Sequence, residues 1–471
     1  MSPSAPNTPS TQPRYDRRTL LALAGGIAVA AFEARAARAL SLPRALPRGA
    51  ADSWELPGHD LAATRAGGQI AGTRVEWRAD LTGGVAGAPA IVDGSVFAAS
   101  VGGLVARFDL ATGHAPWRRR FPTPTYGGGK TARRLGFFGG VAVSEGRVLA
   151  ASDRVYCLDA ATGRTLWESK PLRTSTSDDY FWGPPVVTRG LVLVGSGSGA
   201  ELPTARGRLS AYSLRDGSLV WSTATVPAAA NGGGIIAPAS VDLRASLAYV
   251  ASGSPYRAVR GSNPGTCSLL ALRVDDGAVA WSDQIYPADR HGFDFNSAPV
   301  ILGRILVAAN KDGFHAWDRV ARRHLWHRRL TPSLSKNGGV AGPTNGPEGG
   351  PVATDGSRFY VLSNDASHND CVAAALVPST GSVVWRRRLP SFSFAAPALA
   401  GDRLFATGAD GTLRALETAT GRVVAAIPLG APSTGAPAVG DGRLVVGAGA
   451  EPFLPGHLLV CVGSARVAGA R

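Results

Sequence analysis

The sequence contains very little sulfur: four cysteines and one methionine in 471 residues. No two cysteines are close in the chain, which excludes the C-x-x-C spacing of many zinc sites and the C-x-x-C-H motif that attaches haem covalently. Four cysteines allow three disulfide pairings, and buried free thiols are an equally open alternative. The residues concerned are Cys157, Cys267, Cys371 and Cys461.

Long hydrophobic runs are also missing. No segment after the N-terminus has the roughly 18 consecutive apolar residues that a membrane-spanning helix needs, so we expect no membrane span in the mature chain. The apolar run that ends at Phe32 has only about 13 residues. It follows the pair Arg17-Arg18 and precedes Ala37-Arg38-Ala39, which matches a small-x-small cleavage site.

This order of segments predicts a twin-arginine signal peptide over residues 1–39 and a linker over 40–51. We therefore expect export to the periplasm, the cell surface or the exterior. An N-terminal membrane anchor that is never cleaved is the alternative. The twin-arginine route carries folded proteins, often with a cofactor already bound, so it also hints at a cofactor.

No basic run is interleaved with aromatic residues, although the formal net charge is +15. The arginines are scattered along the whole chain. A nucleic-acid groove needs clustered cations and stacking rings, so we expect no nucleic-acid partner. A scattered basic surface favours a soluble protein and is able to steer an acidic partner protein.

Glycine and proline are abundant, with 60 and 33 residues, as in chains with many tight turns. After residue 50 the sequence repeats a short turn that is followed by tryptophan, as in Ala161-Thr162-Gly163 to Trp167. Eight such positions lie 40 to 60 residues apart, which is typical of propeller blades. They are Trp77, Trp117, Trp167, Trp221, Trp281, Trp326, Trp385 and Ala425, where the tryptophan is lost.

Each repeat also contains short strand-like segments bounded by Gly, Pro and Asp. Four strands in each of eight repeats predict an all-β, eight-bladed β-propeller with four-stranded antiparallel blades over residues 52–466, followed by a tail over 467–471. Residues 436–462 lack a final tryptophan strand, whereas Val75–Trp77 is such a strand without a blade before it. Their pairing would close the ring and hide sheet edges. We expect the tryptophans to pack one blade against the next and to carry no chemistry.

The repeat unit resembles the pyrroloquinoline quinone (PQQ) repeat, and the similarity covers nearly all of residues 52–466. The opening, from Trp54 to Trp77 with Gly58-His59-Asp60 and Thr64-Arg65, is similar to that of quinoprotein alcohol dehydrogenases of the polyvinyl-alcohol dehydrogenase branch. Non-catalytic scaffolds similar to the outer-membrane assembly lipoprotein share this repeat. The resemblance therefore implies the fold, whereas the function has to be argued from the site.

Three stretches resemble site motifs of the quinoprotein dehydrogenases. Glu201 matches the glutamate that binds a catalytic calcium or lanthanide ion, and carboxylate oxygens are what such hard cations prefer. Asp294 matches the aspartate that acts as the catalytic base and also contacts the metal. Lys311 matches a cation that is hydrogen-bonded to the quinone oxygens. The resemblance implies PQQ and a calcium or lanthanide ion as cofactors.

The chain departs from the family pattern at several positions. Ser254 stands where the family has an asparagine metal ligand, and Ile236 stands where it has the tryptophan beneath the quinone. Asn296 stands where some members carry a second acidic ligand. The pair of adjacent cysteines found in many alcohol dehydrogenases is absent. Arg134, with its neighbour Arg133, is a weaker candidate for binding the cofactor carboxylates.

Two functions from different classes follow. The first is an exported dehydrogenase that oxidises an alcohol or sugar with PQQ and, lacking a haem motif, passes electrons to a separate acceptor. The second is a propeller that binds a ligand or protein partner without redox chemistry. A hydrolase or lyase on the same scaffold is a third alternative, for which the sequence offers no Ser-His-Asp pattern.

Overall fold

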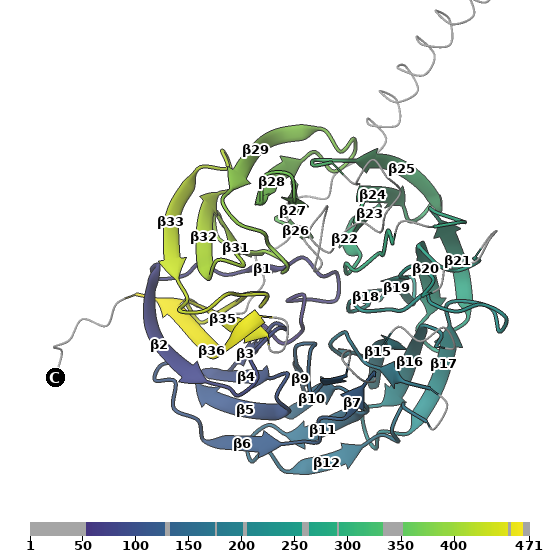
Figure 1. The fold of residues 1–471 in the computed structure, drawn as a ribbon, viewed down its shortest axis with the longest axis horizontal. Coiled ribbons are helices and arrows are strands. Elements are labelled where there is room, and N and C mark those ends of the chain that lie inside the picture. The colour runs from purple at the N-terminus through teal and green to yellow at the C-terminus, as the bar shows by residue number, and fades with distance from the viewer. Residues whose placement is uncertain are drawn as a thin grey trace, which may run out of the picture. The chain divides into compact units, whose positions relative to one another are not determined.

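The computed structural model describes residues 53–127, 132–174, 177–200, 205–256, 263–289, 292–332, 352–450 and 454–464. These residues form eight four-stranded antiparallel sheets arranged around a central channel (Figure 1), which confirms the predicted all-β, eight-bladed propeller. No helix within these ranges is long and apolar enough to cross a membrane. Three predicted segments lie outside the described residues: the signal peptide over 1–39, the linker over 40–51 and the tail over 467–471.

We number the blades in chain order and give each from its innermost to its outermost strand. Blade 1 is β3 (Ala90–Val92), β4 (Ser95–Ala99), β5 (Leu104–Asp109) and β6 (Trp117–Arg120); blade 2 is β9 (Ala142–Ser144), β10 (Arg147–Ala151), β11 (Val155–Asp159) and β12 (Thr165–Glu168). Blade 3 is β14 (Val186–Thr188), β15 (Leu191–Ser198), β16 (Arg208–Ser213) and β17 (Leu219–Ala224); blade 4 is β18 (Ser240–Asp242), β19 (Leu247–Ala251), β20 (Ser268–Arg273) and β21 (Val279–Gln284).

Blade 5 is β22 (Val300–Leu302), β23 (Ile305–Asn310), β24 (Gly313–Asp318) and β25 (Arg323–Arg328); blade 6 is β26 (Val352–Thr354), β27 (Phe359–Asp365), β28 (Asp370–Leu376) and β29 (Val383–Leu389). Blade 7 is β30 (Ala398–Ala400), β31 (Arg403–Thr407), β32 (Thr412–Glu417) and β33 (Val423–Pro428); blade 8 is β34 (Ala438–Gly440), β35 (Arg443–Ala450), β36 (Leu454–Gly463) and β2 (Arg74–Asp80). Outside the blade order lie β1 (Ala66–Gly67), β7 (Thr125–Tyr126), β8 (Arg133–Arg134) and β13 (Asp179–Tyr180).

The blades are held together by the tryptophans of their outer strands. The indole N–H of Trp117 donates a hydrogen bond to the carbonyl of Ala160 in the next blade, at 3.1 Å. Gly163 of that next blade lies against the ring face, where a Cβ would come within 2.6 Å of the indole. The same pair of contacts recurs for Trp77, Trp167, Trp221, Trp326 and Trp385. In these six blade pairs the turn glycine of one blade packs against the tryptophan of the preceding blade, which explains why the two residue types repeat together.

The ring closes as the sequence predicted. Strand β2 pairs antiparallel with β36, with Trp77 opposite Cys461, so blade 8 combines both ends of the propeller. Blade 8 has no turn between its third and fourth strands, because β36 ends at Gly463 and β2 begins at Arg74. A tryptophan at 425, on the outer strand of blade 7, would find no turn glycine to pack against, which accounts for Ala425.

An N-terminal belt, residues 53–71, lines the channel from inside. Its backbone exchanges two hydrogen bonds with Ile91 of blade 1 and then accepts one from the innermost strand of blades 2, 4, 5, 6 and 7 in turn. These bonds run from Val143, Val241, Ile301, Thr354 and Leu399 to the belt carbonyls. The belt thus covers inner sheet edges that would otherwise face the channel, and β1 is the part of it that pairs with β30 (Figure 1).

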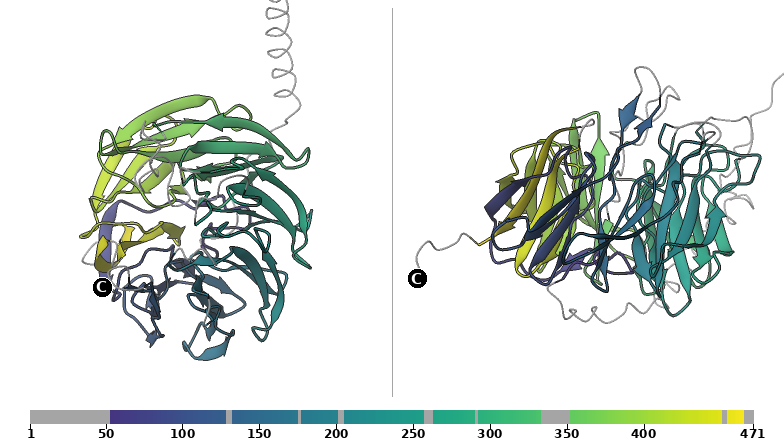
Figure 2. Two further views of the ribbon diagram at one scale, coloured as in Figure 1. Left: turned by 45° about the vertical axis from the view of Figure 1, so that its right-hand side comes forward. Right: turned by 90° about the horizontal axis from the view of Figure 1, so that it is seen from below.

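The strand order gives the ring two distinct faces. One face carries the connections between the second and third strand of each blade and the connections between blades; we call it the site face. The opposite face carries the tight turns that dock the tryptophans. The hairpin of β7 and β8 interrupts the connection from blade 1 to blade 2 and stands out from the ring in the right-hand view of Figure 2.

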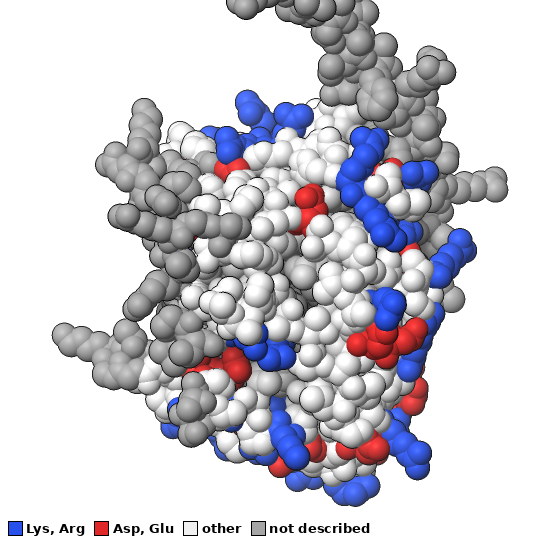
Figure 3. All heavy atoms as spheres, turned by 90° about the vertical axis from the view of Figure 1, so that its right-hand side faces the viewer, with Lys and Arg blue, Asp and Glu red and all other residues white. Residues whose placement is uncertain are grey.

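All four cysteines are buried and free, so the structure resolves the alternative that the sequence left open. On the side shown in Figure 3, Lys and Arg are interspersed with Asp and Glu rather than gathered in one patch, in line with the scattered charge of the sequence.

Candidate functional site

Most candidate residues lie in site-face connections of neighbouring blades. Ile236 is in the connection that enters blade 4, and Ser254 follows β19 within that blade. Asp294 is in the connection that enters blade 5, and Lys311 is in the tight turn between β23 and β24. The propeller topology therefore gathers residues that are far apart in the sequence at the boundary of blades 4 and 5.

Asp294 is the centre of this group. Its Oδ1 accepts a hydrogen bond from the backbone N–H of Ser254 at 2.7 Å, and its Oδ2 lies 3.2 Å from Nζ of Lys311. The Asp294 side chain is 33% exposed and that of Lys311 is 13% exposed. An ionised carboxylate offers about four acceptor positions, so Asp294 is fixed in place and still has an accessible side. The roles assigned to these residues from the resemblance stay predictions.

The hydroxyl of Ser254 points to a second carboxylate, that of Asp289, which sequence reasoning missed. Ser254 Oγ donates to Asp289 Oδ2 at 2.7 Å, and the same oxygen accepts the N–H of Phe293 at 2.9 Å. Asp289 is buried, and its charge together with burial raises the pKa of the neighbouring Cys267 thiol. No sequence signal distinguishes Asp289 from other loop aspartates, because its partner Ser254 is 35 residues away in the chain.

Tyr256 joins the glycine-rich stretch of blade 3 to this group. Its hydroxyl accepts the N–H of Ser198 at 2.8 Å. It lies between Gly197 and Gly234, where a Cβ on either glycine would be 2.7 Å from the hydroxyl oxygen. Burial raises the pKa of Tyr256, so its hydroxyl stays neutral and remains a donor. The two glycines are required for this close approach.

A cavity of about 520 Å³ occupies the channel; Asn296 lines it, whereas Asp294, Lys311 and Ser254 do not. Ile236 lines it and is 38% exposed. Trp182 also lines it and packs edge-to-face on Phe138, with ring centroids 5.3 Å apart. Sequence analysis missed Trp182 as a residue of the cavity wall, because it is not one of the repeating tryptophans. Arg65 of the N-terminal belt reaches the same cavity.

One candidate, Arg134, does not join the group, and another, Glu201, is not described by the structure. Arg134 is exposed on the β7–β8 hairpin, where its Nη2 donates to Thr123 Oγ1 at 2.7 Å, and it is not among the residues that line the cavity. Glu201 lies outside the described residues.

The described residues do not form a hard-cation site by themselves. Calcium prefers six to eight oxygen ligands. Within the described ranges, no group of three or more His, Cys, Asp or Glu side chains is arranged to hold a metal ion. Both oxygens of Asp294 bind donors of this chain, and the hydroxyl of Ser254 binds Asp289. We therefore assign no step to a metal.

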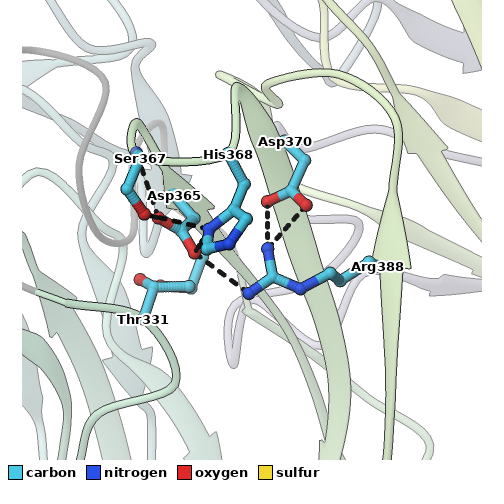
Figure 4. Close-up of polar contacts among 7 residues, drawn as sticks. Thr331, Asp365, Ser367, His368, Asp370 and Arg388 are labelled. Carbon is cyan, nitrogen blue, oxygen red and sulfur yellow. Dashed lines mark hydrogen bonds and ion pairs between the residues drawn. The ribbon is translucent and has the colours of Figure 1, made fainter.

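A polar cluster in blade 6 contains Ser, His and Asp without forming a catalytic triad (Figure 4). Ser367 Oγ and Asp365 Oδ2 both lie 2.9 Å from the same ring nitrogen, Nδ1 of His368. A triad needs the two groups on opposite ring nitrogens, so that one nitrogen takes the serine proton while the aspartate orients the ring through the other. Arg388 bridges Asp365 and Asp370 in the same loop. These hydrogen bonds and ion pairs stabilise the turn between β27 and β28.

The fold and the channel cavity together define a PQQ-type repeat propeller. The family model described as "Outer membrane protein assembly factor BamB" matches residues 58–134, 127–341 and 316–451. The chain belongs to this family of PQQ-type repeat proteins.

Several individual proteins that are similar to this chain are alcohol dehydrogenases. The chain is 29% identical over 285 residues to quinohemoprotein alcohol dehydrogenase ADH IIB of Pseudomonas putida, covering 50% of this chain and 40% of that protein. It is 25% identical over 431 residues to polyvinylalcohol dehydrogenase of Sphingopyxis sp. (strain 113P3), covering 74% and 62%. The matches span 40 to 50% of the length of several such relatives.

The crystal structure of quinohemoprotein alcohol dehydrogenase from Comamonas testosteroni has the same fold. It superimposes with a TM-score of 0.73 at 20% identity, covering 89% of this chain and 82% of that one.

Proposed function

We propose that this protein is an exported quinone-dependent dehydrogenase that oxidises an alcohol or sugar with PQQ bound in the channel cavity. The observation that carries the proposal is the Asp294–Lys311 pair, which is partly exposed and is fixed by the backbone of Ser254. Asp294 lies two residues before Asn296, which lines the apolar cavity. A positioned carboxylate is the group that alcohol oxidation needs as a base. The similarity to quinohemoprotein and polyvinylalcohol dehydrogenases supports the same chemistry.

In this proposal each residue has one task. PQQ, when bound, supplies the two-electron acceptor for the hydride that leaves the alcohol carbon. Asp294 accepts the hydroxyl proton of the substrate, and its hydrogen bond from Ser254 holds the receiving oxygens in place. Lys311 places positive charge beside the reacting atoms, where negative charge develops. Electrons leave the protein through a separate acceptor, since the chain has no C-x-x-C-H haem motif.

The cavity suits an aromatic cofactor in volume, since ligand sites typically measure ~300–1,000 Å³. Trp182 and Ile236 would provide its walls. Ile236 gives dispersion contacts but no ring stacking, so we expect weaker cofactor binding than a tryptophan at this position would give. A calcium or lanthanide ion remains part of the proposal only through Glu201 together with Asp294 and Ser254.

A non-redox binding scaffold is the second candidate. It is favoured by the hydroxyl of Ser254, which is engaged by Asp289 instead of being available to a metal. The description of the family model, an outer-membrane assembly factor, is in keeping with this alternative.

Reconstitution separates the two candidates. The purified protein is titrated with PQQ in the presence of calcium or lanthanum, with binding followed by calorimetry and absorbance. We expect saturable one-to-one binding and alcohol oxidation with an artificial electron acceptor. Absence of binding at about 50 µM PQQ with either metal would leave the scaffold as the function.

A matched pair of variants tests the role of Asp294. Asp294→Asn should lower the turnover rate by about 10²–10⁴, the usual contribution of a general base. Asp410→Asn is the control, because Asp410 is 34% exposed and pairs with Arg414, and it lies in the β31–β32 turn of blade 7. Equal activity of the two variants would exclude Asp294 as the base.

A further inference from the structure

The boundary between blades 4 and 5 lacks the tryptophan contact that joins most other blades. The outer-strand tryptophan of blade 4 is Trp281, and its indole N–H is buried without a hydrogen-bond partner among the described residues. In the turn of blade 5, Arg322 stands at the position of the docking glycine, with φ +55°. At the six docked boundaries that position has no side chain, and a Cβ there would touch the indole ring. The boundary between blades 4 and 5 therefore depends on other contacts.

Histidines of blade 5 occupy this boundary. His315 lies on β24, and His324 and His327 lie on the neighbouring strand β25. The rings of His315 and His327 are stacked, with centroids 4.2 Å apart and an interplanar angle of 4°. Nδ1 of His315 lies 3.2 Å from Nε2 of His324. His315 faces blade 4, because Trp317, two residues further along β24, donates its indole N–H to Asp283 of that blade at 2.6 Å.

The surroundings of the three rings offer little compensation for an added positive charge. Nε2 of His327 lies 3.5 Å from the carboxylate of Asp312. That carboxylate is already engaged, because it accepts two hydrogen bonds from Arg329 and one from the hydroxyl of Tyr286. The charged and titratable groups that face the rings are Asp283, Tyr286, Asp312, Arg328 and Arg329.

Protonation conflicts with this packing for two reasons. The contact between His315 and His324 needs one ring nitrogen as an acceptor, and an imidazolium has only donors. Two imidazolium rings stacked as closely as His315 and His327 would repel each other in a poorly solvated place. Burial accordingly lowers the pKa of all three histidines, and it lowers that of His315 well below its ordinary value.

We propose that the boundary between blades 4 and 5 is a pH-sensitive seam, at which proton uptake by the stacked histidines in mildly acidic solution separates blade 5 from blade 4 while the tryptophan-docked boundaries stay closed. Above about pH 6.5 the histidines are neutral whether the seam is closed or open. Below that pH the open seam binds protons that the closed seam cannot, so the closed state loses stability as the pH falls. This inference goes beyond the proposed dehydrogenase function and does not depend on it.

Hydrogen exchange of the purified full chain, without cofactor or substrate, measures the opening. After correction for the intrinsic pH dependence of amide exchange, the exchange of β24 and β25 should accelerate by about 30-fold between pH 7.5 and pH 5.0. That factor corresponds to one histidine with an ordinary pKa of about 6.5 when open that remains neutral when closed. The reference strands are β11 and β12 of blade 2, which has docked tryptophans at both boundaries, and their exchange should change far less.

Variants assign the response to the histidines. His315→Asn removes the buried ring that can take up a proton and should abolish most of the acceleration. His327→Gln, at a side chain that is 30% exposed, should also reduce it and serves if His315→Asn does not fold. His457→Gln is the matched control, because His457 is 50% exposed and pairs with Asp80 in blade 8, away from the seam. This control should keep the full response.

Two results would overturn the proposal. The first is an equal acceleration of exchange in blades 2 and 5, because acid would then loosen the propeller as a whole. The second is a response of β24 and β25 that is the same in His457→Gln as in the histidine variants of the seam that fold.

Discussion

The contact between Trp117 and Gly163 allows the docking of one blade on the next to be measured with a well-matched control. Gly163 has φ +69°, and a Cβ there would lie 2.6 Å from the Trp117 ring. Gly146, in the same blade, also has φ +69°, but a Cβ there would meet no atom within 4 Å. Alanine at either position suffers the same left-handed backbone strain, about 1–2 kcal/mol. Only alanine at 163 also displaces the tryptophan.

The expected difference follows from the two contacts that are lost. Forcing a methyl group into a packed contact destabilises by about 1–3 kcal/mol. Moving the indole also breaks the hydrogen bond from Trp117 to Ala160, worth about 1 kcal/mol. Gly163→Ala should therefore lower the free energy of unfolding by about 2–4 kcal/mol more than Gly146→Ala.

Urea unfolding followed by circular dichroism measures this difference, with both variants compared at the same protein concentration. A larger loss for Gly163→Ala, with an unchanged spectrum of the folded state, is the expected result. If the two variants unfold within about 0.5 kcal/mol of each other, the glycine does not serve the tryptophan of the preceding blade, and the account of the repeat given above is wrong.

Two further predictions concern other parts of the propeller. Burial raises the pKa of three of the four cysteine thiols to about 12, so a thiol reagent at pH 8 should label the denatured protein and leave the folded protein unlabelled; rapid labelling of the folded state would contradict the buried positions. Glu76→Gln should destabilise the protein by about 3 kcal/mol, because the buried carboxylate of Glu76 pairs with Arg443 at 2.7 Å across the closing blade; thermal unfolding without any change would show that this pair does not hold the ring closed.

The ring was predictable because its determinants repeat. Tryptophan and glycine recur with the blade period, and the unpaired half-blades at the two ends of the propeller specify closure. The belt was not predictable in the same way, since it occurs once and has neither helical nor strand periodicity. Its conformation depends on backbone bonds to strands of six different blades, which no local pattern encodes.

The candidate site was predictable only where a short motif carried it. Asp294 and Lys311 were identified by resemblance, and the structure places them 3.2 Å apart. Asp289 and Trp182 were missed because their importance arises from contacts between connections of different blades. Arg65 was noted only as part of an opening motif, and its unusual burial depends on how the belt crosses the channel.

The position of β2 has a consequence for how the protein is made. The strand is synthesised before blade 1, yet its partner β36 is the last strand of the propeller to be synthesised. At about 5–20 residues per second, β2 waits on the order of tens of seconds as an unpaired strand. During this time the ring is not closed and β2 lacks its partner. An exposed, unpaired strand is able to pair with other chains. Completion of the ring is therefore a late event in synthesis, and a chaperone that shields residues 74–80 would protect the unpaired strand until β36 is made.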